Sequence, residues 1–252
     1  MLQEEVVENA SAKRCRDVIV CGFYTPDYAE IAANLAKSLD LHSIPYKLYP
    51  VEKFGKAWIA QPLRKPEIIL RCMEEFPHRV VIFMDADCTV HADISPLIEE
   101  VVDVGVYFFK TPRGPKKGQI FPSSRVVVCR PTERTKLFLE NWRGKCQETI
   151  QKLLAVDGSE RKLWSRGLTE DNDEKLLLDA MAETSHLNIH ILPASFSAYE
   201  EGEDCIVSHK SARDKLAPPE KGPSIFKQFR RRIVELAVGK PYAEWKNEKL
   251  RK

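Results

Sequence analysis

One stretch of sequence decides the fold most clearly, residues 80–89, which reads VVIFMDADCT. Its first five residues are all apolar, which is typical of a short strand buried on both faces. The run ends at Asp85 and Asp87, two carboxylates on either side of the small residue Ala86. Residues i and i+2 of an extended chain point to the same side, so the sequence predicts two carboxylates that face one point.

The segments before this strand repeat a strand–helix pattern. Residues 18–24 are apolar and predict a strand, and Thr25 followed by Pro26 is typical of a helix start. A helix over residues 28–39, a strand at 46–51 and a helix over residues 66–76 are predicted next. This alternation predicts an α/β fold in which ligands bind beyond the carboxyl ends of parallel strands, where Asp85 and Asp87 lie.

The segments after residue 90 are less regular. Apolar runs and helical spacing predict strands at 104–109, 125–130, 188–192 and 205–208, and helices at 132–154 and 173–181. No linker precedes Pro218 and Pro219. We therefore predict one domain over residues 14–217, with a mixed central sheet, and an extension over residues 218–252.

Composition excludes several classes of protein. The 252 residues are 43% hydrophobic and 30% charged, as in an ordinary globular protein, and the net charge of +2 gives no sign of a nucleic-acid partner. The seven cysteines form no C-x-x-C pair, which favours reduced, buried thiols over a disulfide or zinc framework. With neither a signal peptide nor an 18-residue apolar stretch in the sequence, we expect a cytoplasmic protein.

The charge is concentrated near the C-terminus. Residues 221–252 carry ten Lys and Arg against three Glu. Apolar residues between 225 and 237 fall on one helical face, with basic residues opposite and beside it. This pattern predicts a basic amphipathic helix at residues 223–238, a candidate peripheral contact with the inner face of a membrane; packing against the body of the protein is the alternative.

Asp85 and Asp87 fit two chemistries as well as a simple acidic turn. Mg²⁺ and Mn²⁺ prefer oxygen ligands and complete their shells with phosphate oxygens. Residues 85–89 match the Asp-x-Asp-x-Thr motif of haloacid-dehalogenase-type phosphohydrolases, in which the first Asp is a covalent nucleophile. In nucleotide-sugar transferases both aspartates serve a metal that holds a diphosphate. Two strand–helix units before the motif, and no later Gly-Asp-x-x-x-Asp, favour the transferase.

The sequence resembles the GT-A superfamily of glycosyltransferases, the nucleotide-diphospho-sugar transferases. The most specific match is residues 83–97, an apolar strand, the Asp-x-Asp motif and a D-[IL]-x-x-L passage. Further matches are Tyr24-Thr25, Arg64-Lys65-Pro66, residues 122–142, Asp173-Glu174 and residues 206–210. The Asn and Gly that the family has around Ser123 and Ser124 are absent here.

The resemblance implies roles for individual residues. Asp85, Asp87 and His209 are expected to bind Mn²⁺ or Mg²⁺. The residues expected to bind the donor are Tyr24, Thr25, Lys65, Asp85, Ala86 and Lys210. Asp173, and after it Asp171, are expected to act in catalysis or to bind the transferred sugar, although acidic residues also stabilise the first turn of a helix.

The resemblance implies the transfer of a sugar from a nucleotide diphosphate sugar, with a UDP-sugar favoured, to a hydroxyl group of a glycan, lipid-linked or protein acceptor. Retention of the anomeric configuration is expected, because a strand that ends in His is more typical of retaining members. A Mg²⁺-dependent phosphohydrolase and a catalytically silent nucleotide-sugar-binding protein remain the alternatives.

Overall fold

The computed structural model describes residues 7–9, 17–54, 58–111, 118–155, 171–198 and 205–209. The chain divides into two compact units, residues 1–212 and 213–252, and every described residue belongs to the first. The amphipathic helix predicted at residues 223–238 lies outside the described residues, as does Lys210. Among the described helices, none is long and apolar enough to span a membrane.

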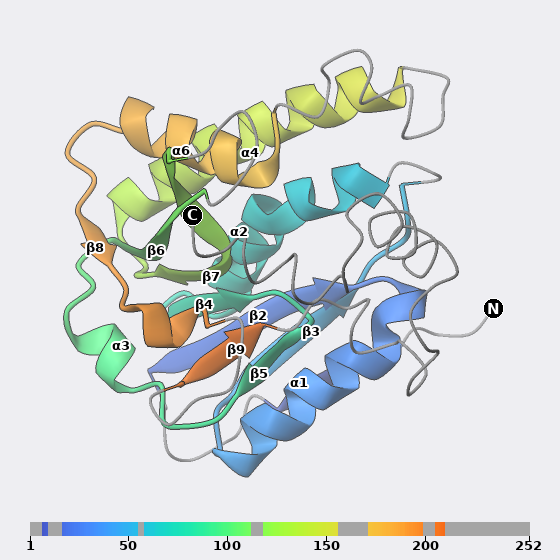
Figure 1. Ribbon diagram of the computed structural model, residues 1–252, viewed down its shortest axis with the longest axis vertical. Helices are drawn as coiled ribbons and strands as arrows, with labels where there is room; N and C mark the ends of the chain where they lie inside the picture. The colour runs from blue at the N-terminus through green and yellow to red at the C-terminus, as the bar shows by residue number, and fades with distance from the viewer. Residues whose placement is uncertain are drawn as a thin grey trace, which may run out of the picture. The chain divides into compact units, whose positions relative to one another are not determined.

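Seven of the described strands form a mixed sheet at the centre of this unit, in the order β1-β3-β2-β4-β7-β6-β8 (Figure 1). The strands β3, β2 and β4 run parallel, whereas β7 is antiparallel to both of its neighbours. Their bounds are β1 Val7–Asn9, β2 Val18–Tyr24, β3 Tyr46–Pro50, β4 Val80–Met84, β6 Val104–Lys110, β7 Ile120–Cys129 and β8 Ile189–Ile191. The mixed α/β sheet is as predicted.

Strand β7 begins five residues earlier than the sequence pattern predicts. After an irregularity between Val106 and Phe108, the end of β6 pairs again with residues 120–122 of β7. This pairing extends the strand into a segment rich in polar residues and Pro, which periodicity alone assigns to a loop. The extension makes Ser124 part of β7.

A second, two-stranded sheet pairs two segments that are more than 100 residues apart in the sequence. In it β5 (Cys88–Val90) pairs antiparallel with β9 (Val207–His209), with Cys88 opposite His209. The ring of His91 forms a hydrogen bond of 2.7 Å with the hydroxyl of Ser208, next to this pairing. Only three residues long, β5 was not predicted, yet it brings His209 beside the residues that follow β4.

Helices cover both faces of the central sheet (Figure 1). On one face, α1 (Ala29–Leu41) packs its buried residues against Val20 and Ile82. On the other, α2 (Lys65–Glu75), α4 (Glu133–Leu154) and α6 (Asp173–Glu183) pack against Phe83 and Val127. Five free cysteines are buried in these two cores, as expected for reduced thiols: Cys21, Cys72, Cys88, Cys129 and Cys146.

The helix starts follow the sequence signals. Thr25 has an extended backbone and precedes Pro26, the first residue of the short helix η1 (Pro26–Tyr28), which leads into α1. The Thr132 hydroxyl accepts the backbone N–H of Thr135 at 3.1 Å and caps α4. Asn172 caps α6 in the same way, accepting the N–H of Lys175 at 2.9 Å. The cap places Asp173 at the first position of α6.

Gly22 allows β2 to lie close to the end of β4. A Cβ atom at this position would lie 2.6 Å from the carbonyl oxygen of Met84, the residue before Asp85. Because the clash is with backbone, we expect Gly22→Ala to lower the free energy of unfolding by about 1–3 kcal/mol, measured by urea denaturation.

The control is Gly144, which is exposed on α4. Apart from its chain neighbours and the backbone of α4 itself, a methyl group added there would have no heavy atom of the described residues within 4 Å. Gly144→Ala should therefore raise the free energy of unfolding by about 0.5–1 kcal/mol. Wild-type stability of the Gly22 variant would contradict this account of the strand spacing.

Candidate functional site

Asp85, Ala86 and Asp87 form a tight turn at the end of β4. The N–H of Asp85 donates to the carbonyl of Arg125 at 2.9 Å, and the N–H of Cys88 donates to the carbonyl of Asp85 at 2.9 Å. The prediction of an extended segment was therefore wrong, because the chain must turn here to enter β5. The turn still brings the two carboxylates toward one point.

Two side chains of this turn and one from β9 form a candidate metal centre. One ligand atom from each of Asp85, Asp87 and His209 lies within 4.8 Å of the other two. The ring Nε2 of His209 is 2.8 Å from a carboxylate oxygen of Asp87, and both side chains are 14% exposed. Two carboxylates and an imidazole suit Mn²⁺, and Mg²⁺ less closely because of the nitrogen. The residues present therefore fit the divalent cation that the sequence predicts.

Lys65 links this turn to α6 and β7. Its side chain is buried, and its ammonium lies 3.0 Å from Asp85 and 2.9 Å from Asp173. The ammonium also donates to the hydroxyl of Ser124 at 2.9 Å, and that hydroxyl donates to Asp173 at 2.5 Å. Sequence reasoning named Lys65, Asp85 and Asp173 for separate reasons, whereas the structure joins them in one network.

The charges of Lys65 and Asp173 support one another, whereas burial leaves the pKa of Asp85 raised despite its contact with Lys65. Burial by itself lowers the pKa of Lys65, but the carboxylates of Asp173 and Asp85 raise it above its ordinary value. Burial raises the pKa of Asp173, but Lys65 and the hydrogen bond from Ser124 hold it below the usual range. Asp173 is therefore ionised at neutral pH and Lys65 is charged.

Glu174 follows Asp173 in the chain, and its pKa is shifted in the opposite direction. Burial, and then the neighbouring carboxylate of Asp173, raise the pKa of Glu174 to about 7. A carboxyl group with this pKa can both accept and donate a proton near neutral pH. Sequence reasoning quoted Glu174 and Ser124 within the family resemblance but assigned them no role, because position in a motif does not reveal burial or contacts.

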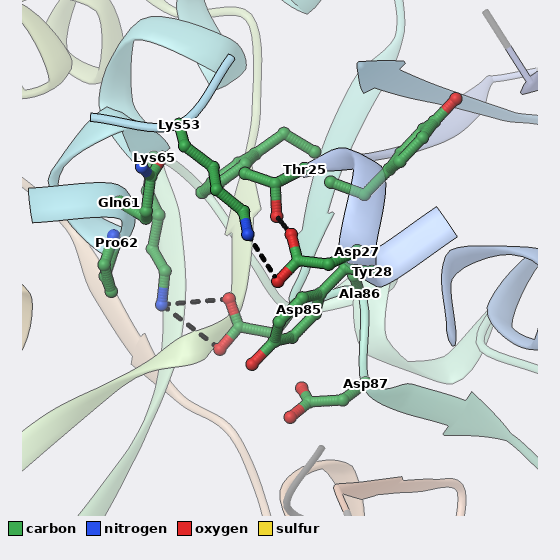
Figure 2. Close-up of a pocket in the computed structure, with 12 residues that line it drawn as sticks. Thr25, Asp27, Tyr28, Lys53, Gln61, Pro62, Lys65, Asp85, Ala86 and Asp87 are labelled. Carbon is green, nitrogen blue, oxygen red and sulfur yellow. Dashed lines mark hydrogen bonds and ion pairs between the residues drawn. The ribbon is translucent and has the colours of Figure 1, made fainter. Parts of the chain in front are cut away.

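A pocket of about 360 Å³ opens beside the aspartate turn (Figure 2). Its walls come from the end of β2, η1, the helix η2 (Trp58–Arg64), the start of α2 and the turn after β4. The lining residues are Phe23, Tyr24, Thr25, Asp27, Tyr28, Lys53, Gln61, Pro62, Lys65, Asp85, Ala86 and Asp87. Five of the six residues predicted to bind a donor therefore lie at one pocket, and the sixth, Lys210, is outside the described residues.

Polar groups on one wall of this pocket are held in place by each other. Thr25 donates its hydroxyl proton to Asp27 at 2.7 Å, and Lys53 forms an ion pair of 2.9 Å with the same carboxylate (Figure 2). Asp27 and Lys53 are each about half exposed, so they lie within reach of solvent and of a ligand. The sequence did not single out either residue.

Asp171, predicted as a second catalytic carboxylate, has a different environment from Asp173. Its side chain is 46% exposed and lies 3.3 Å from the ammonium of Lys175, four residues along the chain. Lys175 also pairs with Asp179 at 2.7 Å. The contacts of Asp171 thus stabilise the first turns of α6, whereas Asp173 is held by Lys65 and Ser124.

Comparison with known proteins identifies the fold. No protein-family model and no curated protein sequence matches the chain. Among solved structures, the chain is similar to a glycosyltransferase involved in the glycosylation of the major capsid of PBCV-1, with a TM-score of 0.52 and 16% identity over 80% of this chain and 96% of that one. The chain has a GT-A-like glycosyltransferase fold.

Two further solved structures show weaker similarity to the chain. The glycosyltransferase GlyE of Streptococcus pneumoniae TIGR4 has a TM-score of 0.44 and 14% identity, and the match covers 84% of this chain but 59% of GlyE. The galactosyltransferase LgtC, solved with donor and acceptor sugar analogues, has a TM-score of 0.44 and 12% identity over 88% of this chain and 96% of LgtC. Both TM-scores are below 0.5, so the fold assignment rests on the first structure.

Proposed function

We propose that the chain is a glycosyltransferase that moves a sugar from a nucleotide diphosphate sugar to a hydroxyl acceptor with the help of Mn²⁺ or Mg²⁺. A UDP-sugar is the favoured donor. One observation carries the proposal: Asp85, Asp87 and His209 converge within 4.8 Å at the edge of a 360 Å³ pocket on a GT-A-like fold. Carboxylates that bind a cation at a pocket of this size suit a diphosphate ligand.

The donor's diphosphate is expected at the aspartate turn. Asp85, Asp87 and His209 would hold the cation, which neutralises the diphosphate and stabilises the charge that it gains as it leaves. Ala86, between the two ligands, leaves space for the phosphates, and Lys210 is expected to add positive charge. Without a cation, the two aspartates would repel the diphosphate.

The nucleoside is expected along the wall formed by residues 24–28. Tyr24 and Tyr28 offer aromatic surface to a base, and Thr25 and Asp27 offer hydroxyl and carboxylate groups to hydrogen-bond a ribose. The ion pair with Lys53 fixes the Asp27 carboxylate before a ligand arrives. A preformed wall of this kind reduces the entropy lost on binding.

The transferred sugar is expected on the far side of Lys65, next to Asp173. Lys65 holds Asp85 and Asp173 at 3.0 Å and 2.9 Å, so the cation-binding carboxylate and the sugar-side carboxylate keep a fixed separation. An ionised Asp173 can accept hydrogen bonds from sugar hydroxyls.

In the reaction, the bond between the anomeric carbon and a phosphate oxygen breaks, and the diphosphate leaves with the electron pair. The acceptor oxygen bonds to that carbon and gives up its proton to the departing diphosphate, and we propose that the configuration is retained.

The acceptor and its location belong to the same proposal. A glycan, a lipid-linked sugar or a protein hydroxyl would each supply the attacking oxygen. A peripheral membrane contact through residues 223–238 would suit a lipid-linked acceptor, and it stays a prediction from sequence. A cytoplasmic location likewise stays a prediction.

Two alternatives to the transferase differ from it in the products that they predict, since one makes other products and one makes none. A phosphohydrolase would use Asp85 as a nucleophile, but in the structure this carboxylate is an ion-pair partner of Lys65 on a GT-A-like fold. A silent binding protein would use the same pocket without any chemistry. The two can therefore be separated from the transferase by product analysis.

The test is to incubate the chain with Mn²⁺, mixed hydroxyl acceptors and four donors, namely UDP-glucose, UDP-galactose, UDP-N-acetylglucosamine and GDP-mannose, and to identify products by mass spectrometry. We expect a nucleoside diphosphate together with a glycosylated acceptor, or with the free sugar when water accepts it. Release of a sugar phosphate or inorganic phosphate, with phosphoryl labelling of Asp85, would establish the hydrolase. Donor binding with no product at all would establish the silent protein.

A further inference from the structure

We propose that Gln61 reads the base of the donor nucleotide, its side-chain oxygen accepting a hydrogen bond from an N–H group on the edge of the base. This inference rests on the proposed function, because it assigns a residue within the donor pocket. It concerns a residue that neither the sequence patterns nor the fold comparison singled out.

The side chain of Gln61 has an unsatisfied hydrogen-bonding group. Gln61 lies in η2 and lines the pocket, and its Oε1 atom is buried without a hydrogen-bond partner among the residues that the structure describes. Buried polar atoms in folded proteins are nearly always paired, since they otherwise lose the hydrogen bonds they make in water. An exception on the wall of a ligand pocket is explained if a bound ligand supplies the missing donor.

The side chain of Gln61 also lies within reach of a ligand in the pocket. Lys65 follows it by four residues, about one helical turn, so the two side chains lie on the same wall, opposite Thr25 and Asp27 (Figure 2). Of the three described residues on this wall, Pro62 has no polar side-chain atom and Lys65 has only donors. Gln61 is therefore the side chain among them that can accept a hydrogen bond.

The extent of the pocket indicates which part of the donor Gln61 meets. The lining residues end at Lys65 and at the aspartate turn, and neither Ser124 nor Asp173, on the sugar side of Lys65, lines it. The pocket thus accommodates the nucleoside and its phosphates, with the sugar beyond Lys65. On the opposite wall Asp27, a half-exposed carboxylate, suits the ribose hydroxyls.

The chemistry of a carboxamide matches the edge of a base better than it matches a hydroxyl. Uracil presents an N–H next to a carbonyl oxygen, and a glutamine amide presents an acceptor next to a donor. The last torsion of a glutamine side chain has a broad energy minimum, so the amide can turn its oxygen from its buried position toward the base. Binding would then satisfy Oε1 and orient the nucleoside between the two walls.

The test is the variant Gln61→Met, which keeps the length of the side chain and removes its hydrogen-bonding groups. Calorimetry in Mn²⁺ should show UDP and UDP-glucose bound about tenfold more weakly, both by the same factor. Without ligand, the variant should melt at the wild-type temperature or above it, because an unpaired buried carbonyl has been removed. Gln151→Met, at an exposed position on α4, is the matched control and should change neither property.

A modified ligand identifies the contact on the base. The analogue 3-methyl-UDP lacks the N–H of uracil, so wild type should bind it about tenfold more weakly than UDP, whereas Gln61→Met should bind the two almost equally. The proposal is overturned if Gln61→Met binds UDP as wild type does, or if only UDP-glucose is weakened. If wild type does not bind UDP in Mn²⁺, the proposed function itself fails, which is a separate outcome from an unaffected Gln61 variant.

Discussion

Replacing Asp87 with alanine is expected to lower the rate of sugar transfer by about a thousandfold, equivalent to about 4 kcal/mol of transition-state stabilisation. Asp87 is one of three candidate ligands, and its carboxylate oxygen lies 2.8 Å from the ring of His209. Without the Asp87 carboxylate, the site keeps one carboxylate and one imidazole. These are too few protein ligands to bind a hard cation firmly in contact with the diphosphate. The measurement is the steady-state rate with Mn²⁺ for the donor on which wild type is most active.

The fold of the Asp87 variant should be intact, because the side chain lies in a turn and belongs to neither core. The control is Asp179→Ala on α6, which removes a carboxylate that pairs with Lys175 at 2.7 Å, and its rate should stay within about twofold of wild type. If Asp87→Ala is folded and retains more than about a tenth of the wild-type rate, Asp87 does not hold a catalytic cation.

Replacing Lys65 with methionine is expected to give the largest loss of stability, about 3–5 kcal/mol. The ammonium is buried between Asp85 and Asp173, and its removal leaves two carboxylates without their shared counter-charge. At about 2–4 °C for each kcal/mol, the melting temperature should fall by roughly 6–20 °C. Thermal unfolding followed by circular dichroism measures the change.

A double variant tests whether the loss comes from the uncompensated charge. Lys65→Met combined with Asp173→Asn should be more stable than the sum of the two single changes predicts, because the second change removes one of the stranded charges. Lys145→Met is the control, since Lys145 pairs with the exposed Glu183 at 2.7 Å and should contribute less than about 1 kcal/mol. A Lys65→Met variant as stable as the control would show that the network contributes nothing to folding.

The parts of the fold that sequence predicts are those set by local patterns. The apolar run of β4 and the helical spacing of α4 depend on neighbours within a few residues, and both elements were predicted in place. The start of β7 was missed because its pairing with β6 after an irregularity is a tertiary effect. The turn at Asp85 was missed because β5, which it leads into, forms only by pairing with β9.

In the candidate site, too, some residues could be predicted from the sequence, whereas others are revealed only by tertiary contacts. Asp85 and Asp87 follow β4, His209 is the last residue of β9, and the resemblance to a family named all three. The network around Lys65 joins residues up to 108 positions apart in sequence, and no spacing rule reveals that Lys65 meets Asp173. Gln61 gives no signal in the sequence at all, since only its buried, unpaired oxygen distinguishes it from a surface glutamine.

The central claim is that Asp85, Asp87 and His209 hold a cation that binds the diphosphate of a nucleotide. Titration calorimetry of the full chain with UDP, once in Mn²⁺ and once in EDTA, tests this claim most directly. We predict one binding site in Mn²⁺ and an affinity lower by at least about tenfold in EDTA, because a bound cation is needed to offset the two carboxylates. Equal affinity in Mn²⁺ and in EDTA, or no binding in either, would contradict the account.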